Sequence, residues 1–313
     1  MAFSYRIEQA DNLSSIWLID SKSGFEAEIY TIGGILNAFT IEVNGEKNNV
    51  VDGFSSLEEA KKTLSDSFKS AFLSPFTCRM NKGNYRFNDI DYSIEKYYLP
   101  PHAIHGIVFD AVYTIKHIVS NETFACVTLE STYTGTDKGY PFHYAIEHEW
   151  KLASEGMLSV TTKITNQHVQ SIPYAQGWHP YFSLSNTIDG CYLKIDTNTL
   201  IEFDDTLIPT GKKQLDTRFE NGILLENIFL DNCFELKDIQ DAHCTLFDEQ
   251  LQLKIVPDKS YPFVQVYTPP ERKSIAIENL SGAPDCFNNK MGLTMIEPNA
   301  NAIFVTTYFL SKR

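Results

Sequence analysis

The sequence predicts an all-β protein in which β-sheets pack face to face. Apolar and polar residues alternate over residues 144–152, 158–164 and 251–255, and period-two alternation is typical of half-buried strands. Turn residues separate these runs, and the 16 Tyr and 21 Phe suit pleated, half-buried positions. Many short strands with polar turns and almost no helical pattern favour sheet-on-sheet packing.

Three dipeptides mark sharp changes of chain direction. Asn44-Gly45 follows the strand-like residues 39–43 and predicts a hairpin, and Asn88-Asp89 predicts another between residues 85–87 and 90–92. Gly33-Gly34 lacks the third glycine and the following helix of a dinucleotide-binding loop. We therefore expect a bulge or a close backbone approach there.

One segment predicts a helix, from about Ser56 to Phe68. Ser56 is a good N-cap, because its hydroxyl can accept a hydrogen bond from a free backbone N–H of the first turn. Glu58 and Glu59 then place negative charge at the positive end of the helix dipole.

Composition excludes several classes of protein. The 313 residues carry 26 Lys and Arg against 40 Asp and Glu, a net charge of −14, which disfavours binding to nucleic acid or to an anionic membrane. No apolar run reaches the ~18 residues of a membrane-spanning helix, and the first residues do not form a signal peptide. We expect a cytoplasmic protein, with residues 1–313 in a single β-sandwich domain that is a monomer or a homodimer.

Sequence motifs for cofactors and metals are absent. The six cysteines form no CxxC pair and no Cys/His cluster with zinc spacing, so we expect reduced, buried thiols and no metal. No GxxxxGK[ST], HExxH or GxSxG sequence occurs. We therefore expect no cofactor.

Three polar segments interrupt the alternation and hold candidate functional residues. Residues 99–106 place His102 and His105 in a loop shaped by Pro and Gly, and residues 174–182 place His179 among aromatic residues. Glu278 ends an apolar run before a turn rich in Ser, Gly and Pro. A buried carboxylate is costly unless it is paired, which favours a functional role for Glu278.

Six short segments, in order along the chain, match one known family. They are Pro-Phe-Thr-Cys-Arg-Met at residues 75–80, His-Ala-Ile-His-Gly at 102–106, Gly-Trp-His-Pro-Tyr-Phe at 177–182, Leu-Asp-Asn-Cys-Phe at 230–234, Phe-Val-Gln-Val-Tyr-Thr at 263–268, and Ile-Glu at 277–278 with Gly-Ala-Pro-Asp-Cys-Phe-Asn at 282–288. On these segments the chain resembles the aldose 1-epimerase (galactose mutarotase) family over about residues 25–310.

The resemblance implies a large antiparallel β-supersandwich and an isomerase that interconverts the α and β anomers of an aldose without a metal or nucleotide. By position, Glu278 would be the general base, His179 the general acid and His105 a helper near the ring oxygen. The sugar hydroxyls would be held by Arg79, Asp231 and Gln265. Separately from the resemblance, we expect Trp178, Tyr181 and Tyr267 to supply apolar contacts to the sugar ring, although packing in the core is the more common use of aromatic residues.

The chemistry itself agrees with this residue set. Opening a hemiacetal ring removes a proton from the O1 hydroxyl and delivers one to the ring oxygen O5. A carboxylate suits the first task and an imidazolium the second. A glycosidase would instead need two carboxylates flanking the bond, and the sequence suggests only one convincing acid.

Three departures from the family pattern keep the substrate open. Cys78 and His102 stand where the family has asparagine, and Ile107 replaces a glycine. One alternative is a hexose-6-phosphate 1-epimerase, whose phosphate would need cations such as those of Arg79, Arg86, Arg272, Lys82 and Lys273. Another alternative is a sugar-binding protein that has kept the cleft without turnover.

Overall fold

The computed structural model describes residues 2–313 and contains 29 β-strands, two short α-helices and two 3₁₀ turns within that range. The strands form six sheets, and every strand pair within them is antiparallel. The prediction of an all-β, sheet-on-sheet protein is therefore confirmed. That residues 1–313 make up a single domain stays a prediction.

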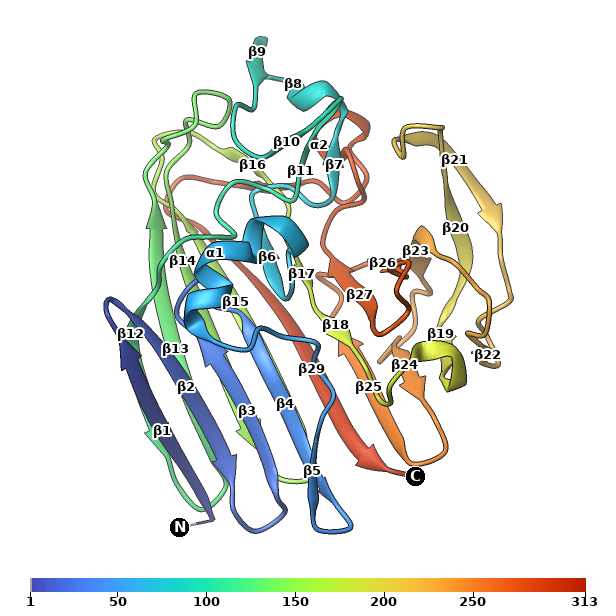
Figure 1. Cartoon of the computed structure of the whole chain (residues 1–313). Helices are drawn as coiled ribbons and strands as arrows, with labels where there is room; N and C mark the ends of the chain where they lie inside the picture. The colour runs from blue at the N-terminus through green and yellow to red at the C-terminus, as the bar shows by residue number, and fades with distance from the viewer. Residues whose placement is uncertain (1) are drawn as a thin grey trace.

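The largest sheet has nine strands and supplies the back layer in Figure 1. Its strands in spatial order are β12 (Thr114–Ser120), β13 (Phe124–Tyr133), β14 (Tyr144–Ala153), β15 (Met157–Asn166), β29 (Asn301–Lys312), β25 (Leu251–Pro257), β24 (Cys244–Phe247), β19 (Tyr192–Ile195) and β22 (Ile223–Leu224). Buried and less buried residues alternate along β14, β15 and β25, as the three sequence windows predict.

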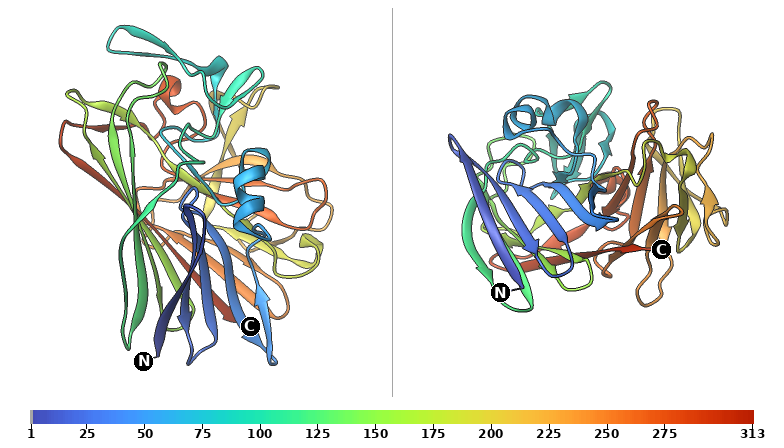
Figure 2. Two further views of the ribbon diagram at one scale, coloured as in Figure 1. Left: turned by 60° about the vertical axis from the view of Figure 1, so that its left-hand side comes forward. Right: turned by 60° about the horizontal axis from the view of Figure 1, so that its bottom comes forward.

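A five-stranded sheet packs against β12, β13, β14 and β29 and forms a second layer, drawn in blue in Figures 1 and 2. Its strands are β1 (Phe3–Ala10), β2 (Leu13–Asp20), β3 (Phe25–Tyr30), β4 (Leu36–Val43) and β5 (Glu46–Asn49). The predicted hairpin at Asn44-Gly45 joins β4 to β5. Between the layers lies a continuous apolar core that includes Ile16, Leu18, Val127 and Trp150.

An eight-stranded sheet stands beside these layers and carries most of the polar candidates. It comprises β21 (Pro209–Leu215), β20 (Thr197–Phe203), β23 (Asp231–Leu236), β26 (Phe263–Tyr267), β27 (Ile275–Leu280), β17 (Gly177–His179) and β6 (Ala71–Leu73), with β18 (Tyr181–Phe182) also paired to β27. Strand β27 is buried along its whole length, because it lies between two neighbours in the middle of the sheet.

Three small sheets lie at one end of the molecule, at the top of Figure 1. The small sheets pair β10 (Tyr98–Leu99) and β7 (Arg79–Met80) with β11 (His102–Ile104), β8 (Asn84–Phe87) with β9 (Ile90–Ser93), and β16 (Ile172–Tyr174) with β28 (Thr294–Ile296). The helical segments are α1 (Leu57–Ser67), α2 (Cys286–Asn289), η1 (Asn81–Gly83) and η2 (Ile188–Gly190). The predicted hairpin at Asn88-Asp89 joins β8 to β9.

Helix α1 confirms the helix prediction residue by residue. The Ser56 Oγ accepts a hydrogen bond from the Glu59 backbone N–H at 3.1 Å, which is the expected N-cap. Phe68 ends the helix in a left-handed conformation, and its backbone N–H donates to the Leu64 carbonyl.

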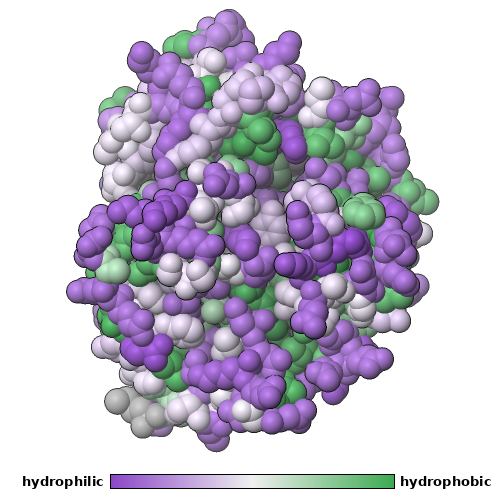
Figure 3. All heavy atoms as spheres, in the orientation of Figure 1, coloured by the Kyte–Doolittle hydropathy of each residue, from purple (hydrophilic) through white to green (hydrophobic). Residues whose placement is uncertain are grey.

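The remaining fold-level predictions agree with the structure. Gly33 and Gly34 both have positive φ, and a Cβ on Gly33 would lie 2.6 Å from the Phe109 carbonyl oxygen, which is a close backbone approach. All six cysteines are buried free thiols. Within residues 2–313, no helix is both long and apolar enough to cross a membrane. Hydrophilic residues dominate the face drawn in Figure 3.

Candidate active site

The eight-stranded sheet aligns polar residues in a row across three neighbouring strands. Glu278 on β27 lies opposite Gln265 on β26, and Gln265 lies opposite Cys233 on β23. Asp231 lies two residues before Cys233 on β23, and Tyr267 lies two residues after Gln265 on β26. Side chains two residues apart on a strand point to the same face, so Asp231 and Tyr267 face the same side of the sheet as this row. The sheet therefore gathers a carboxyl pair, an amide, a thiol and a phenol on one face.

Strand β17 adds His179 to this row. Gly177 pairs with Leu280 and Tyr181 pairs with Ala276, so the antiparallel register places His179 opposite Glu278. The register predicts close contact, and the His179 Nε2 lies 3.3 Å from the Glu278 Oε1. Residues 99 positions apart in the chain thus meet at one point of one sheet.

Two loops bring the other predicted residues to the same place. Cys78 and Arg79 lie at the start of β7, and His105 directly follows β11, which pairs with β7. The His105 backbone N–H donates to the Cys78 carbonyl at 2.8 Å. Gly106 makes this approach possible, since a Cβ there would lie 2.2 Å from the Ser74 carbonyl oxygen.

Most of these side chains line one cavity of about 740 Å³, a size within the usual range for small-molecule sites. The predicted residues that line it are Arg79, His105, His179, Asp231, Gln265 and Glu278. Tyr181 and Tyr267, which the sequence suggested as ring contacts, also line it.

Trp178 is the exception, and its predicted contact with a sugar is wrong. Successive side chains of a strand point to opposite faces, so Trp178 points away from the cavity when His179 points into it. The Trp178 ring packs instead against Phe72, His148 and Trp150 in the apolar core. The sequence places Trp178 and His179 on opposite faces, but only the structure tells which face is the cavity.

Burial sets the electrostatics of the central pair. Glu278 is 1% exposed, and the loss of water around its carboxylate raises its pKa well above the ordinary value. His179 is 4% exposed, and burial lowers its pKa to about 4. A carboxyl with a raised pKa is a stronger base when ionised, and an imidazolium with a lowered pKa is a stronger acid.

His105 and Cys78 complete the buried floor of the cavity. The His105 ring lies edge-on to the His179 ring, with 4.9 Å between ring centroids, and burial lowers the His105 pKa well below its usual value. The Cys78 Sγ lies 3.8 Å from the Glu278 Oε2, so the two oxygens of Glu278 face different partners. Burial, followed by the nearby Glu278 carboxylate, raises the pKa of the Cys78 thiol.

The hydroxyl-binding candidates keep free hydrogen-bonding capacity. The Gln265 Nε2 donates to the Asp231 Oδ1 at 2.7 Å, and the Gln265 Oε1 is buried without a partner. Burial raises the pKa of Asp231, and the nearby Arg79 guanidinium opposes that shift. Within residues 2–313 the Arg79 guanidinium has no hydrogen-bond acceptor, which leaves its donors available to a ligand in the cavity.

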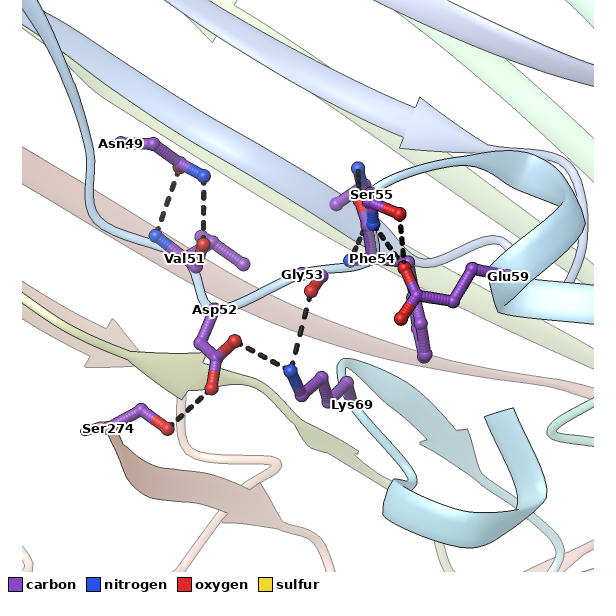
Figure 4. A network of polar contacts seen from close by, with 10 residues as sticks. Asn49, Val51, Asp52, Gly53, Phe54, Ser55, Glu59, Lys69 and Ser274 are labelled. Carbon is purple, nitrogen blue, oxygen red and sulfur yellow. Dashed lines mark hydrogen bonds and ion pairs between the residues drawn. The ribbon is translucent and has the colours of Figure 1, made fainter. Parts of the chain in front are cut away.

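The rim of the cavity contains a polar network that sequence reasoning missed. Lys69 donates to the Asp52 Oδ1 at 2.6 Å, and the Ser274 hydroxyl donates to the Asp52 Oδ2 at 2.7 Å (Figure 4). These residues come from the β5–α1 connection, from the loop after α1 and from the position directly before β27. No local motif marks them, because they come from three separate segments of the chain.

Only two of the five cations proposed for phosphate binding reach the cavity, namely Arg79 and Lys273. Arg86 pairs with Asp89 and Asp91 on the β8–β9 hairpin. Arg272 binds Asp189 and the backbone carbonyls of residues 225 and 228, so it holds loops together. Lys82 and His102 lie outside the cavity lining, and the His102 Nδ1 accepts from the Lys82 backbone N–H.

The geometry agrees with comparisons to known proteins. The family model for aldose 1-epimerases matches residues 15–302. The chain belongs to the aldose 1-epimerase family. Membership supports an isomerase activity of the epimerase type.

Two curated proteins are similar to this chain in sequence. It is 25% identical over 233 residues to the uncharacterised protein YihR of Escherichia coli, covering 72% of this chain and 73% of YihR. It is 28% identical over 229 residues to human galactose mutarotase, covering 69% and 60% of the two chains.

This chain has a fold similar to that of a galactose mutarotase-like protein from Clostridium acetobutylicum, with a TM-score of 0.88 at 18% identity. The match covers 100% of this chain and 99% of that protein. Galactose 1-epimerase from Lactobacillus acidophilus has a TM-score of 0.84 at 16% identity, with coverage of 99% and 98%. The predicted galactose mutarotase-like supersandwich is confirmed.

Proposed function

We propose that this protein is an aldose 1-epimerase that interconverts the α and β anomers of a free hexose. The observation that carries the proposal is the 3.3 Å contact between the His179 Nε2 and the Glu278 Oε1 inside the cavity. One acid and one base at this separation can reach the O1 and O5 atoms of one pyranose, which are bonded to the same anomeric carbon.

In the proposed mechanism, the Glu278 carboxylate accepts the proton of the O1 hydroxyl while protonated His179 donates a proton to O5. The C1–O5 bond breaks and leaves an open-chain aldehyde. Rotation about C1–C2 presents the other face of the carbonyl, and ring closure returns both protons in reverse. Each positioned proton transfer contributes roughly 10² to 10⁴-fold, so an acid and a base account for the chemistry.

The other residues of the cavity position the sugar. We assign Arg79, Asp231 and Gln265 to its hydroxyl groups, because their free donors and acceptors face the same space. His105 lies beside His179 and is assigned to the region of the ring oxygen. Tyr181 and Tyr267 supply apolar surface for the carbon–hydrogen face of the ring.

A phosphorylated hexose is the second candidate substrate. The Lys273 ammonium lines the cavity with Arg79 and has no ion-pair partner within residues 2–313. A phosphate dianion would gain charge-assisted hydrogen bonds from both cations. Turnover of glucose 6-phosphate that exceeds turnover of glucose and is lost in Lys273→Ala would favour this substrate.

The test is anomer exchange measured by saturation-transfer NMR on galactose, glucose and glucose 6-phosphate. We expect exchange above the buffer rate on at least one sugar and its loss in Glu278→Gln. Exchange that is equal in wild type and Glu278→Gln would contradict the mechanism. Calorimetric sugar binding without exchange would instead support the sugar-binding alternative, which Cys78 in place of an asparagine motivates.

The pH dependence tests the assignment of acid and base. The value of kcat/KM should be bell-shaped in pH, because the Glu278–His179 pair must hold a single proton to start the reaction. The two apparent pKa values belong to the pair rather than to either residue. A flat profile between about pH 4 and 9 would overturn the assignment.

A further inference from the structure

Three buried side chains in the cavity offer one ligand atom each to a common point. The Cys78 thiol, one His105 ring nitrogen and one Glu278 carboxylate oxygen all lie within 4.8 Å of one another. They are 4%, 8% and 1% exposed. These positions, 78, 105 and 278, are far apart in the chain, so no zinc-spacing motif could reveal them.

The hydrogen bonding inside this cluster is incomplete. The His105 Nδ1 is buried and has no hydrogen-bond partner. The Cys78 thiol approaches the Glu278 Oε2 at 3.8 Å, and a thiol is a weak donor. Buried polar groups without partners are uncommon and call for an explanation such as an ion or ligand that binds there.

The backbone holds the cluster in place. Cys78 and His105 both have left-handed φ angles, +46° and +61°, which non-glycine residues adopt at a cost. The 2.8 Å hydrogen bond from the His105 N–H to the Cys78 carbonyl ties these two residues together. Residues kept in such conformations cluster at sites whose geometry is pre-formed.

We propose that Cys78, His105 and Glu278 form a binding site for Zn²⁺, and that the bound ion blocks the sugar site. Thiolate, imidazole and carboxylate are the three ligand types that zinc takes in proteins, at about 2.0–2.3 Å. Three protein ligands leave a fourth position, which opens into the cavity. The soft thiolate favours zinc over Mg²⁺ and Ca²⁺, which prefer oxygen ligands.

Charge and hydrogen bonding around the cluster suit a dication. A thiolate and a carboxylate side by side repel each other, and each raises the energy of the other's ionised form. Zinc would relieve this repulsion by binding both anions, and the thiol proton would pass to solvent as the Zn–S bond forms. The Glu278 Oε1 would keep its contact with His179, which orients the ligating carboxylate from the second oxygen.

The consequence for activity rests on the proposed function. A Glu278 carboxylate that ligates zinc is a weaker base, because the dication stabilises its ionised form, so it would accept the O1 proton less readily. The ion would also occupy space that lines the sugar cavity. Zinc and sugar should therefore compete, and each should weaken the apparent affinity of the other by the same factor.

The first test uses chelator-treated, full-length protein and measures metal binding directly. Co²⁺ is added as a spectroscopic probe, and a thiolate-to-cobalt charge-transfer band should appear and then vanish when Zn²⁺ displaces Co²⁺. Isothermal titration calorimetry with Zn²⁺ alone should give one site per chain. Absence of the cobalt–thiolate band together with absence of zinc binding would overturn the proposal.

Variants then locate the site. Cys78→Asn removes the thiolate but suits the backbone, because asparagine tolerates left-handed φ. It should weaken Zn²⁺ binding by ~100-fold or more. Loss of a residue that only hydrogen-bonds to a metal ligand typically lowers the affinity by about 10–100-fold, and loss of the ligand itself should exceed that. His105→Asn has the same backbone tolerance and serves as the second variant. Equal zinc binding by either folded variant and wild type would refute this ligand set.

Cys126→Ser is the matched control. It removes another buried thiol, on β13 of the nine-stranded sheet and outside the cavity lining. Its zinc affinity and its cobalt spectrum should equal those of wild type. Loss of zinc binding in this variant would indicate a different site and contradict the proposal.

The outcomes separate this proposal from the proposed function. Zinc binding that depends on Cys78, without sugar turnover in the metal-free protein, keeps the metal site and refutes the epimerase. Turnover that is unaffected by saturating Zn²⁺ refutes the inhibitory site and keeps the epimerase. Inhibition that EDTA reverses and that excess sugar weakens is the result expected when both are correct.

Discussion

Two buried histidines, one in the nine-stranded sheet and one in the eight-stranded sheet, differ in what surrounds them. His148 on β14 is fully buried, and burial lowers its pKa to about 3. His179 on β17 is 4% exposed, and burial lowers its pKa to about 4. Burial and pKa shift are thus nearly the same, and neither distinguishes a core residue from a reactive one.

Hydrogen bonding does distinguish them. The His148 Nδ1 lies 3.0 Å from the Thr162 hydroxyl and its Nε2 lies 3.1 Å from the Tyr113 hydroxyl, so both nitrogens are satisfied. The His179 Nδ1 has no partner, and its Nε2 faces the Glu278 carboxyl in an open cavity. Fully satisfied polar groups hold a fold together, whereas unsatisfied ones are free to act on a ligand.

The same contrast holds for carboxyl groups. Asp137 is 5% exposed and accepts hydrogen bonds from the backbone N–H groups of Glu95, Lys96 and Gly139. Glu278 is 1% exposed, and its two carboxylate oxygens face a histidine and a thiol instead of backbone N–H groups. We therefore expect Asp137 to matter for stability and Glu278 for activity.

The largest effect should follow Glu278→Gln. This change keeps the shape of the side chain and removes the base, so kcat/KM should fall by ~10³–10⁴-fold while the melting temperature holds or rises. Saturation-transfer NMR and thermal unfolding measure the two quantities. Asp137→Asn is the matched control, and it should retain kcat while losing stability; the reverse result would break the comparison.

His179→Asn should have the next largest effect, a fall of ~10²–10³-fold in kcat/KM from loss of the general acid. Stability should change less than in His148→Asn, because the His179 Nδ1 already lacks a partner and the ring lines an open cavity. Steady-state kinetics with urea unfolding would check both expectations. A variant with wild-type kcat/KM would remove His179 from the mechanism.

His148→Asn should lower stability and leave activity unchanged, the opposite of what we expect for His179→Asn. It leaves a small cavity and takes partners from the Thr162 and Tyr113 hydroxyls, so the free energy of unfolding should fall by ~3 kcal/mol. The activity of the folded fraction should stay at the wild-type value. Urea unfolding and active-site-normalised rates are the measurements, and lost activity at full stability would contradict this interpretation.

The smallest effect is a change in how stability depends on pH. A histidine whose pKa is lowered on folding contributes stability above its unfolded value of about 6.5, and that stability is lost as pH falls. Glu278, whose pKa is raised on folding, has the opposite dependence and offsets His179. His148 has no such counterpart among its contacts.

We therefore expect His148→Asn to reduce the slope of unfolding free energy against pH by up to ~1.4 kcal/mol per pH unit, between about pH 3 and 6.5. The double variant with Glu278→Gln and His179→Asn should leave this slope close to that of wild type. Urea unfolding at several pH values would measure both slopes. An unchanged slope in His148→Asn would show that another group dominates acid sensitivity.

Local features of the chain were predictable from sequence because short-range rules govern them. Period-two alternation located β14, β15 and β25, and Ser56 marked the start of α1. Asn44-Gly45 marked the β4–β5 hairpin. In each case the decisive contacts lie within a few residues or within one strand pair, so the sequence window contains the cause.

The candidate site was predictable only in part. The order of six short segments identified the family, and the residues carried over from it line one cavity. Trp178, which was expected to contact the sugar ring because it is aromatic, packs in the core instead. The Asp52–Lys69–Ser274 network, the packing role of Arg272 and the unused donors of Arg79 were not predictable. Each depends on partners from distant segments, and no local pattern encodes those distances.

The sequence by itself determined where strands, turns and the main helix form, because backbone propensity, capping and side-chain alternation act locally. The tertiary structure decided which face of β17 is cavity and which is core, and it brought Glu278, His179, Cys78 and His105 together. It also removed water from them, and desolvation is what shifts their pKa values. Chemistry at this site therefore arises from packing, since burial and proximity are properties of the folded chain.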